Sequence, residues 1–320
     1  MNRTARICAV VVTYNRIDQM QKTVARLLEE PIDHLVVVDN GSSDGSRDWL
    51  RACTDPRLEL LEMARNIGGA GGFETGLRHV VSVLDPDWIV LMDDDARPEP
   101  GCVAMFRAAD KTGWDAIAAA VFFPDGRICS MNRPVLNPFW HPRIFLRTLA
   151  GGGRAAFHLT DRDYDQAMPQ RVDGGSFVGL FLARRAVEVA GYPDGRLFVY
   201  AEDGLYSLAI SGNGGRVGFF PQLRFEHECS TFSASGQFTP IWKVYFYHRN
   251  LLLLYRRAAG IWFWPALLAV LPKWVLRGLR QKGERLRFLR LLGWAVRDGL
   301  TRRVGWTLDD LQQEMRRRDV

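Results

Sequence analysis

Residues 88–98 read WIVLMDDDARP, so an apolar run ends in three adjacent aspartates. A short, continuous apolar run of this kind is typical of a strand that is buried on both faces of a parallel sheet. Adjacent carboxylates raise one another's pKa unless a cation or hydrogen-bond donors compensate. Along an extended segment Asp93 and Asp95 point to the same side and reach one ion, whereas Asp94 points elsewhere. All-oxygen ligation suits Mg²⁺ or Mn²⁺, and the alternative, a solvated acidic turn or a helix N-cap before Pro98, is disfavoured by the buried strand.

The sequence on both sides of this stretch alternates apolar runs with amphipathic segments. We expect further strands at 7–13, 34–39, 58–62, 116–123, 177–183, 216–220 and 223–227, and helices at 17–29, 46–52, 72–84, 102–111 and from 200 to 210. This alternation indicates an open α/β fold with a mostly parallel sheet and right-handed crossovers. Residues 132–171 are rich in Pro, Gly and Arg without a clean period, which predicts a long loop that could act as a mobile lid.

Composition excludes several classes of protein. The chain has 320 residues, enough for about two compact units, and its 47% hydrophobic and 24% charged residues exclude a disordered or fibrous chain. The five cysteines are widely spaced and form no CxxC, which argues against a disulfide framework or a zinc ribbon and fits a reducing compartment. The apolar run at 7–13 is too short for a secretory signal or a membrane span.

Charge is distributed unevenly along the chain. Residues 241–320 carry 17 Lys and Arg against 6 Asp and Glu, whereas the preceding part is net acidic. A nucleic-acid surface is not expected to divide in this way, so nucleic acid is excluded as a partner. We therefore divide the chain into a catalytic domain, 1–238, and a helical, basic and aromatic region, 239–320. Within that region 261–271 is too short to span a bilayer and has flanking Trp, Lys and Arg, which predicts a helix lying on an anionic membrane surface; the alternative is a buried helix packed on the catalytic body.

Polar clusters follow each of the first four expected strands, at 13–16, 39–42, 65–69 and 93–95. Ligands bind at the carboxyl ends of strands in open α/β sheets, so four such clusters predict one functional site rather than a coincidence of loop composition. The glycine-rich residues 68–72 lead into a helix whose N–H groups and dipole can hold phosphate, with a plain tight turn as the alternative. They lack the GxxxxGK[ST] pattern, which excludes a P-loop.

Three further residues are expected to complete the site. Asp39 is predicted to accept a ring N–H of a nucleotide base rather than to cap structure. Asp203 opens an expected helix, whose dipole is predicted to hold the carboxyl pKa down; an ionised carboxylate there suits a general base, and simple capping is the alternative. His227 ends an expected strand and is either a structural histidine or a third metal ligand, in which case its nitrogen favours Mn²⁺ over Mg²⁺.

Taken together, these motifs resemble family 2 glycosyltransferases of the GT-A fold. The matching segments, which span about residues 5–230, are VVVTYNR, VVDNGSSDGS, RNIGGAGGF, VLMDDDARP, GGSFVGLF and FVYAEDGLYSLAISGNG. The combination of RNIGGAGGF and DDD is similar to the branch that contains galactofuranosyl- and rhamnosyltransferases. The resemblance implies a Rossmann-like, mixed and mostly parallel sheet flanked by helices, here with a helical C-terminal extension.

The resemblance also implies roles for individual residues. Asp203 would be the catalytic base, and Asp93, Asp95 and His227 would hold Mn²⁺ or Mg²⁺. The residues implied to bind the nucleotide-sugar are Thr13, Asn15, Arg16, Asp39, Arg65, Asn66, Gly68, Gly69, Asp93 and Asp94.

The implied reaction is an inverting transfer of galactofuranose or rhamnose. UDP-galactofuranose or dTDP-rhamnose would be the donor, and a glycan or a polyprenyl-linked glycan would be the acceptor, at the cytoplasmic face of the cell membrane. The acceptor-side tryptophans of the large galactan polymerases have no clear counterpart in residues 174–177, GGSF. The QxxRW motif of cellulose-type polymerases is also absent, which favours the addition of one or a few sugars.

Two other functions compete with this one. A sugar nucleotidyltransferase would carry a Gly-rich signature with Arg and Lys directly after the first strand, where this chain reads TYNR at 13–16. A non-catalytic glycan-binding protein could use the same fold in a decayed form, but acidic residues stand at all the expected points. Metal-dependent turnover of a nucleotide-sugar would separate the binding protein from the transferase.

Overall fold

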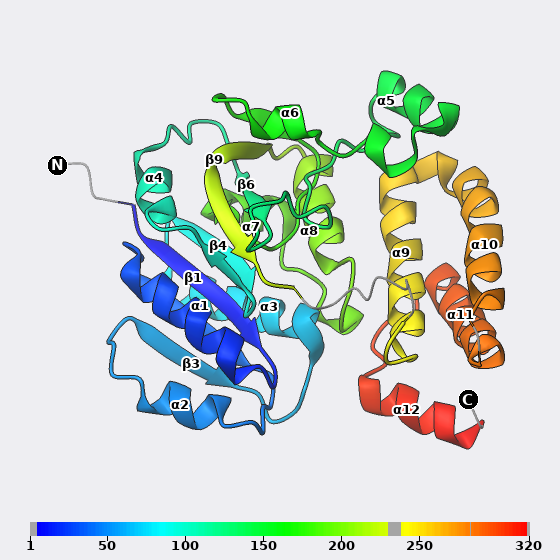
Figure 1. Ribbon diagram of the computed structural model, residues 1–320, viewed down its shortest axis with the longest axis horizontal. Coiled ribbons are helices and arrows are strands. Elements are labelled where there is room, and N and C mark those ends of the chain that lie inside the picture. The colour runs from blue at the N-terminus through cyan, green and yellow to red at the C-terminus, as the bar shows by residue number, and fades with distance from the viewer. Residues whose placement is uncertain (1–4, 230–237, 282, 319–320) are drawn as a thin grey trace.

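The computed structural model describes residues 5–229, 238–281 and 283–318, and its body is an α/β/α sandwich beside a group of helices (Figure 1). The first four strands, β1 (Ile7–Thr13), β2 (His34–Asp39), β3 (Leu58–Glu62) and β4 (Trp88–Asp93), pair in parallel in the order β3-β2-β1-β4. Their sequences are near-continuous apolar runs because helices cover both faces of the sheet. These strands have the bounds expected from the sequence, except that β4 runs one residue further and includes Asp93.

Beyond β4 the sheet is mixed. β8 (Leu180–Ala183) lies antiparallel to both β4 and β6 (Ala116–Phe122), and β9 (Val217–His227) lies parallel to β6. The short strands β5 (Ala96–Pro98) and β7 (Gln170–Val172) run antiparallel to β9. Because β4, β6 and β9 run in the same direction, their carboxyl ends lie at one edge of the sheet, which brings the end of β9 to the end of β4.

Helices cover the two faces of the sheet. One face carries α1 (Ile17–Glu29), α2 (Ser46–Ala52) and α4 (Cys102–Ala108), and the other carries α3 (Gly68–His79), α7 (Arg184–Ala190) and α8 (Glu202–Gly212). Alternate residues of β1 enter the two cores, so that Val11 packs with the α1 layer and Val10 with the α3 layer. This period-two alternation fixes which side chains remain at the strand ends to form a site.

Helix α3 begins at Gly68, four residues before the predicted start, and continues as a π-helical turn, Val80–Leu84. The glycines therefore lie inside the helix. A Cβ atom on Gly72 would stand 2.4 Å from Cγ1 of Val12, so the missing side chain lets α3 lie directly against β1.

Two strand predictions also differ from the structure. The predicted strands 216–220 and 223–227 form the single strand β9, whose pairing with β6 shifts register between Ala119 and Ala120. The predicted strand 177–183 is extended only from Leu180, as β8.

The predicted long loop at 132–171 is interrupted by short regular elements. This segment contains α5 (Pro142–Arg147), a π-helical turn (Thr148–Gly152), a 3₁₀ turn (Gly153–Ala156), α6 (Asp161–Tyr164) and β7. Each piece is only three to six residues long, too short to produce a readable hydrophobic period. Its action as a lid stays a prediction.

The predicted C-terminal helical region is confirmed and consists of α9 (Lys243–Ala259), α10 (Phe263–Leu279), α11 (Arg285–Leu300) and α12 (Leu308–Arg317). Gly260, with φ +52°, lets the chain turn so that α10 returns beside α9 (Figure 1). By length and composition, the helical stretch Lys243–Leu279 is the one segment of the described chain that could cross a membrane, and the turn at Gly260 divides it into two. The boundary between residues 238 and 239 stays a prediction.

Candidate active site

The polar residues that follow the first strands meet at the carboxyl edge of the sheet. In the parallel register Thr13 lies opposite Asp39, and Val12 lies opposite Asp93. The Thr13 hydroxyl donates a hydrogen bond of 2.8 Å to the Asp94 carboxylate. Three of the four predicted clusters are thus neighbours because three parallel strands end in one row.

Asp93, Asp95 and His227 form a cluster in which one ligand atom from each lies within 4.8 Å of the others. The antiparallel pairing of β5 with β9 sets Ala96 opposite His227, which brings the preceding Asp95 beside the imidazole. His227 Nε2 lies 3.2 Å from Asp95 Oδ1. The structure therefore brings together the three residues that the sequence proposed as metal ligands, and places Asp94 outside this cluster.

Asn132 fixes which nitrogen of His227 faces the carboxylates. His227 Nδ1 lies 2.8 Å from Asn132 Oδ1, while Asn132 Nδ2 donates a bond of 2.9 Å to the Ser176 hydroxyl, which fixes the orientation of the amide. A carbonyl oxygen only accepts, so Nδ1 carries the proton and Nε2 is the position open to a proton or a metal ion. No pattern in the sequence pointed to this role, because Asn132 lies in a segment without a hydrophobic period and 95 residues from His227.

Arg16 lies against the aspartates at 93–95, called the acidic cluster below. One of its guanidinium nitrogens is 2.5 Å from Asp95 Oδ2 and 3.3 Å from Asp94 Oδ1. When all three aspartates are ionised, one guanidinium leaves two negative charges uncompensated, which is the charge that a divalent cation would balance. Two carboxylates and an imidazole of fixed orientation are also donors that suit Mn²⁺. The residues at this edge therefore fit a divalent ion.

Burial and mutual repulsion set the protonation of the triplet. Burial, followed by the charge of Asp95, raises the pKa of Asp93 to about 7. Burial also raises the pKa of Asp94 to about 6, although Arg16 opposes the shift. Burial acts on Asp95 in the same direction, but the hydrogen bond and charge of His227, with Arg16, hold the pKa of Asp95 below its usual value. A proton on Asp93 and a cation at the cluster therefore compete.

Without divalent metal, replacement of Asp93 by asparagine is expected to stabilise the fold at alkaline pH. The folded carboxyl binds its proton more tightly than the unfolded one, whose pKa is 3.8, so the free energy of unfolding falls as pH rises from that value to about 7. Asp93→Asn removes this loss and should raise the free energy of unfolding at pH 8 by up to about 4 kcal/mol. Urea denaturation in a chelator across this pH range measures the difference.

The control for this prediction is Asp48→Asn, at an exposed position on α2. It is expected to retain the pH dependence of the unmodified protein. If Asp93→Asn and the unmodified protein lose stability in parallel as pH rises, the repulsion argument is wrong.

Asp39 is fully buried, and only one of its two carboxylate oxygens has hydrogen-bond partners among the described residues. Its Oδ1 accepts hydrogen bonds from the Gly41 and Ser42 N–H groups, at 3.0 and 2.9 Å, and from Arg47 Nε at 2.5 Å. Its Oδ2 has no hydrogen-bond partner among the described residues. A buried carboxylate oxygen without a donor is costly, so this atom suits a ligand N–H.

The other predicted nucleotide residues have structural partners. Asn15 Oδ1 accepts from the Ser43 N–H at 2.7 Å and links the loops after β1 and β2. Asn66 Oδ1 accepts from the Gly68 N–H at 2.8 Å at the start of α3. Arg65 is exposed, and its charge acts on Asp310 of α12.

Gly68 and Gly69 lie where α3 approaches the segment before α8. A Cβ atom on Gly68 would stand 2.0 Å from the Phe198 carbonyl oxygen, and one on Gly69 would stand 3.5 Å from Glu202 Oε1. The absence of a Cβ at Gly68 is thus explained by close backbone packing. A phosphate-binding role for this turn stays a prediction.

Asp203 occupies the first turn of α8, and its Oδ1 accepts from the Gly204 N–H at 2.6 Å. Burial raises the pKa of this carboxyl, so the predicted lowering by the helix dipole is wrong; the cost of desolvating the charge outweighs the backbone hydrogen bonds. Its charge also contributes to the raised pKa of Asp93, so the two carboxyls act on one another across the same site.

Helix α9 holds the backbone that delivers Asp203. Phe198, Tyr200 and Ala201 all have positive φ, a conformation that side chains disfavour. Asn250 Nδ2 donates to the carbonyl oxygens of residues 197, 199 and 200, at 3.1, 2.8 and 2.9 Å, and the buried Arg249 donates to that of residue 197 at 2.7 Å. These bonds compensate the strain. The sequence did not reveal this role of α9.

A cleft of about 610 Å³ opens beside the acidic cluster. Its walls include residues from the loop after β1, from the turn after β6 and from the end of β9, among them Arg16, Asp95, Phe123 and Cys229. The acidic cluster is therefore reachable from solvent on the side where Arg16 lies.

Comparisons with known proteins agree with this arrangement. Residues 8–158 match the profile of Glycosyl transferase family 2. The chain is 28% identical over 246 residues to the galactofuranosyltransferase GlfT1 of Mycolicibacterium smegmatis, covering 75% of this chain and 76% of that one. It is 29% identical over 163 residues to an undecaprenyl-phosphate mannosyltransferase of Micrococcus luteus, covering 49% of this chain and 63% of that one.

A solved structure shows the same fold. The mannosyltransferase PcManGT from Pyrobaculum calidifontis, in complex with GDP-Man and Mn²⁺, superposes with a TM-score of 0.53 at 18% identity, covering 94% of this chain and 89% of that one. The GT-A fold and the glycosyltransferase activity expected from the sequence are confirmed. The family match over residues 8–158 and the galactofuranosyltransferase relatives together support a family 2 glycosyltransferase of the galactofuranosyltransferase branch.

Proposed function

We propose that this enzyme is an inverting, metal-dependent transferase that moves galactofuranose, or as second choice rhamnose, from a nucleotide-diphosphate donor to a hydroxyl of a glycan or polyprenyl-linked acceptor. The observation that carries the proposal is the meeting of Asp93, Asp95 and His227 at one point, with Asp203 within electrostatic reach of Asp93. The sugar nucleotidyltransferase and the non-catalytic binding protein are less well supported, because residues 8–158 match a family of glycosyltransferases.

In this mechanism Asp203 takes the proton of the acceptor hydroxyl, and the hydroxyl oxygen attacks the anomeric carbon on the face opposite the diphosphate, which inverts the configuration. A raised pKa makes Asp203 a stronger base once it is ionised. Mn²⁺ or Mg²⁺ held by Asp93, Asp95 and His227 would neutralise the diphosphate leaving group. Arg16 adds a fixed positive charge at the mouth of the same cleft.

The proposed donor follows from Asp39 and from the relatives. Asp39 Oδ2, a buried acceptor without a partner, would accept the ring N–H that uracil and thymine both present. The remaining proposed nucleotide-sugar residues lie at or after the ends of β1, β3 and β4, and they are Thr13, Asn15, Arg16, Arg65, Asn66, Gly68, Gly69, Asp93 and Asp94. Among donors with these bases, UDP-galactofuranose comes first because the relatives include galactofuranosyltransferases.

A donor panel tests this function. With Mn²⁺ and a short galactan acceptor, UDP release from UDP-galactofuranose should exceed release from UDP-galactopyranose and UDP-glucose by about a hundredfold, a difference of about 3 kcal/mol in transition-state binding. dTDP-rhamnose is the second donor in the panel. Release of pyrophosphate from a nucleoside triphosphate and a sugar phosphate would show a nucleotidyltransferase, and no metal-dependent turnover of any donor would favour the binding protein.

The C-terminal region has an exposed apolar surface on α10. We propose that this surface contacts the membrane in which a polyprenyl-linked acceptor is anchored. One face of α10 packs on its neighbours through Phe263, Leu267 and Trp274, while Leu268 on another side is 76% exposed and Ile261, in the turn just before the helix, is 89% exposed. The burial of one face fits the buried-helix alternative, and the exposure of the other is what the proposed membrane-surface helix requires.

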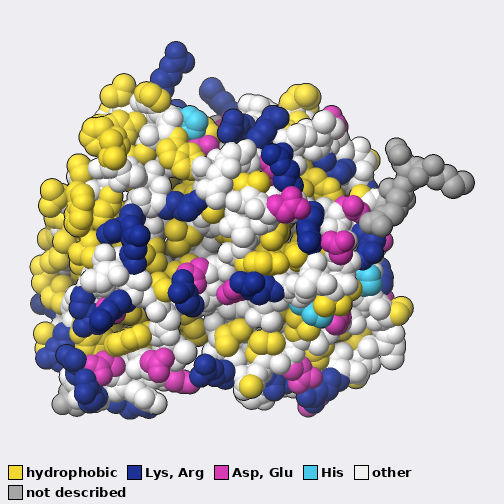
Figure 2. All heavy atoms as spheres, turned by 180° about the vertical axis from the view of Figure 1, so that it is seen from behind, with side chains coloured by type: hydrophobic (Ala, Val, Ile, Leu, Met, Phe, Trp, Pro, Cys, Tyr) yellow, Lys and Arg dark blue, Asp and Glu magenta, His cyan; other side chains and the backbone are white. Residues whose placement is uncertain are grey.

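A second element extends this apolar surface. The ring of Phe145 in α5 lies 5.6 Å from that of Trp262, and Leu146 and Leu149 are exposed beside it. Figure 2 shows hydrophobic side chains gathered along the edge of the molecule that α5 and α10 form. Exposed basic residues flank them, namely Arg143, Arg147, Lys273 and Arg280.

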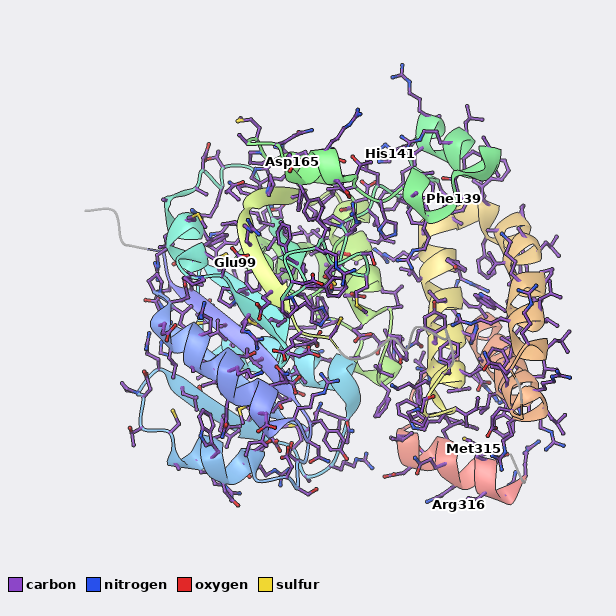
Figure 3. The ribbon with its side chains drawn as sticks, in the orientation of Figure 1. Glu99, Phe139, His141, Asp165, Met315 and Arg316 are labelled. Atoms are coloured by element: carbon purple, nitrogen blue, oxygen red, sulfur yellow. The ribbon has the colours of Figure 1, made fainter. Side chains whose placement is uncertain are left out.

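The segment that presents α5 is tied to the body. Figure 3 shows Phe139 and His141 in the stretch leading from the sheet to α5. His141 Nε2 lies 2.6 Å from the buried Asp173 carboxylate, so the start of α5 is held against the body. We propose that the apolar and basic surface of α5 and α10 docks on an anionic leaflet at the cytoplasmic face of the membrane.

Flotation with vesicles of phosphatidylglycerol and phosphatidylcholine tests the docking. The unmodified chain should float, and a double variant, Trp264→Glu with Leu268→Glu, should lose about nine-tenths of the floating fraction because charge is costly in the interface. The matched control is Val83→Glu with Met105→Glu, at exposed apolar positions of the body. Equal flotation of the two variants would contradict the assignment. A truncation after residue 240 would not test the docking alone, because it would also remove the hydrogen bonds from α9 to residues 197–200.

A further inference from the structure

A second cluster of metal-binding side chains lies on the far side of His227. The Sγ atoms of Cys129 and Cys229 and a ring nitrogen of His227 all lie within 4.8 Å of one another. Cys129 Sγ stands 3.9 Å from His227 Nδ1. Two thiols and an imidazole are ligands that Zn²⁺ prefers, unlike the oxygen-rich set at Asp93 and Asp95. No CxxC marks this site in the sequence, because the fold brings together residues that are about one hundred positions apart.

The spacing of these atoms is close to that of a zinc site. Bonds of about 2.0–2.3 Å in a tetrahedron separate ligand atoms by roughly 3.3–3.8 Å. The ligand atoms here lie within 4.8 Å of one another, so to reach tetrahedral spacing they have to approach by on the order of one ångström. Cys129 is buried and Cys229 is half-buried, and Cys229 lines both the cleft beside Arg16 and a second cleft of about 520 Å³. An ion can therefore reach the cluster from the Cys229 side.

His227 separates the two sets of ligands. Its Nε2 faces Asp95, and its Nδ1 faces Asn132 and Cys129. Asn132 Oδ1 receives hydrogen bonds from both the Cys129 thiol, at 2.9 Å, and Nδ1, at 2.8 Å. The amide oxygen thus lies close to where a cation bound to Cys129 and Nδ1 would lie, so zinc binding has to displace Asn132 from these two donors and from its bond to Ser176.

We propose that Cys129, Cys229 and His227 Nδ1 form a reversible Zn²⁺ site, and that occupation of this site opposes metal binding at Asp93, Asp95 and His227 Nε2. The two thiol protons pass to solvent, and the Nδ1 proton is replaced by the zinc bond while Nε2 takes up a proton. The two thiolates neutralise the ion, the imidazole stays neutral and a water completes the tetrahedron.

The two sites oppose one another because both use a nitrogen of the His227 imidazole. A ring nitrogen that carries a proton has no lone pair for a metal. When zinc holds Nδ1 and the proton is on Nε2, the carboxylate set loses its nitrogen ligand. The zinc site itself does not depend on the proposed transfer reaction; only the inhibition of catalysis rests on it.

Cobalt binding to the full chain tests the site directly. Co²⁺ bound by thiolates absorbs in the near ultraviolet, whereas Co²⁺ bound by carboxylates and imidazole does not. Titration should produce this band with one equivalent of ion, with equal strength in Cys53→Ser, a control at a half-buried cysteine outside the cluster. Cys129→Ser and Cys229→Ser should weaken the binding at least tenfold. A missing band, or a band unchanged in both variants, overturns the site.

Zinc inhibition tests the coupling between the two sites. With Mn²⁺ held constant, Zn²⁺ should inhibit UDP release. For each variant we take the Zn²⁺ concentration that halves that variant's own zinc-free rate. This concentration should rise at least tenfold in Cys229→Ser and stay unchanged in Cys53→Ser. Unchanged inhibition in Cys229→Ser overturns the coupling. If no donor is turned over, the proposed function fails while the cobalt band still decides the zinc site. Should Cys129→Ser not fold, Cys229→Ser decides both measurements.

Discussion

Replacement of Asp203 by asparagine is expected to lower the transfer rate by about 10³-fold, the contribution typical of a general base. The amide has the shape of the carboxylate and retains an oxygen for the Gly204 N–H, so the first turn of α8 keeps its hydrogen bond. It cannot accept the acceptor's proton. Binding of the nucleotide-sugar with Mn²⁺, measured by calorimetry, should change only a few fold, while UDP release in the presence of acceptor falls.

The neighbouring Glu202 supplies the comparison for this variant. Burial raises its pKa well above the usual value, and its Oε2 has no partner among the described residues, so it is the other carboxyl of this turn that could take a proton. We expect Glu202→Gln to retain more than about a tenth of the transfer rate, because an uncharged side chain already suits this buried position. Full turnover by Asp203→Asn together with its loss in Glu202→Gln would move the base to Glu202.

Replacement of Asp95 by asparagine is expected to lower Mn²⁺ affinity and turnover by about 10²-fold or more. Asp95 has the lowered pKa of the triplet, so it is ionised and available to a cation throughout the neutral range. Loss of one charged ligand removes several kcal/mol of ion binding, and the leaving group then lacks its counter-charge. The signal of free Mn²⁺ in electron paramagnetic resonance measures the binding, and UDP release measures the turnover.

Asp94→Asn is the matched control for the binding measurement. Asp94 is adjacent in sequence and equally buried, but its oxygens meet the Thr13 hydroxyl and Arg16. Its substitution should leave Mn²⁺ affinity within a few fold. Equal loss of Mn²⁺ binding in both variants would show that the charge of the triplet, rather than ligation by its outer members, holds the ion.

The residues that the sequence located correctly are those whose placement follows from one strand. Thr13, Asp39 and Asp93 each end a parallel strand, and parallel strands end in one row, so their meeting could be derived without coordinates. His227 could be placed at the same edge because it ends a predicted strand. The pairing of β5 with β9 then brought it into contact with Asp95.

The features that the sequence missed depend on contacts between distant segments. Asn132 reaches His227 from a region without a hydrophobic period, and Asn250 reaches residues 197–200 from a helix that the sequence presented only as apolar and basic. The pKa of Asp203 had the wrong predicted direction for the same reason. The helix dipole is a local property that sequence reveals, whereas burial is produced by the whole fold.

The bonds from α9 to residues 197–200 have a consequence for protein engineering. A chimaera that exchanges helices α9–α12 of this enzyme for those of a relative would also exchange the hydrogen bonds that support the backbone before Asp203, the proposed base. Such a chimaera should keep Asn250 together with the turn at residues 197–201. If the two come from different proteins, the position of Asp203 changes along with the C-terminal helices.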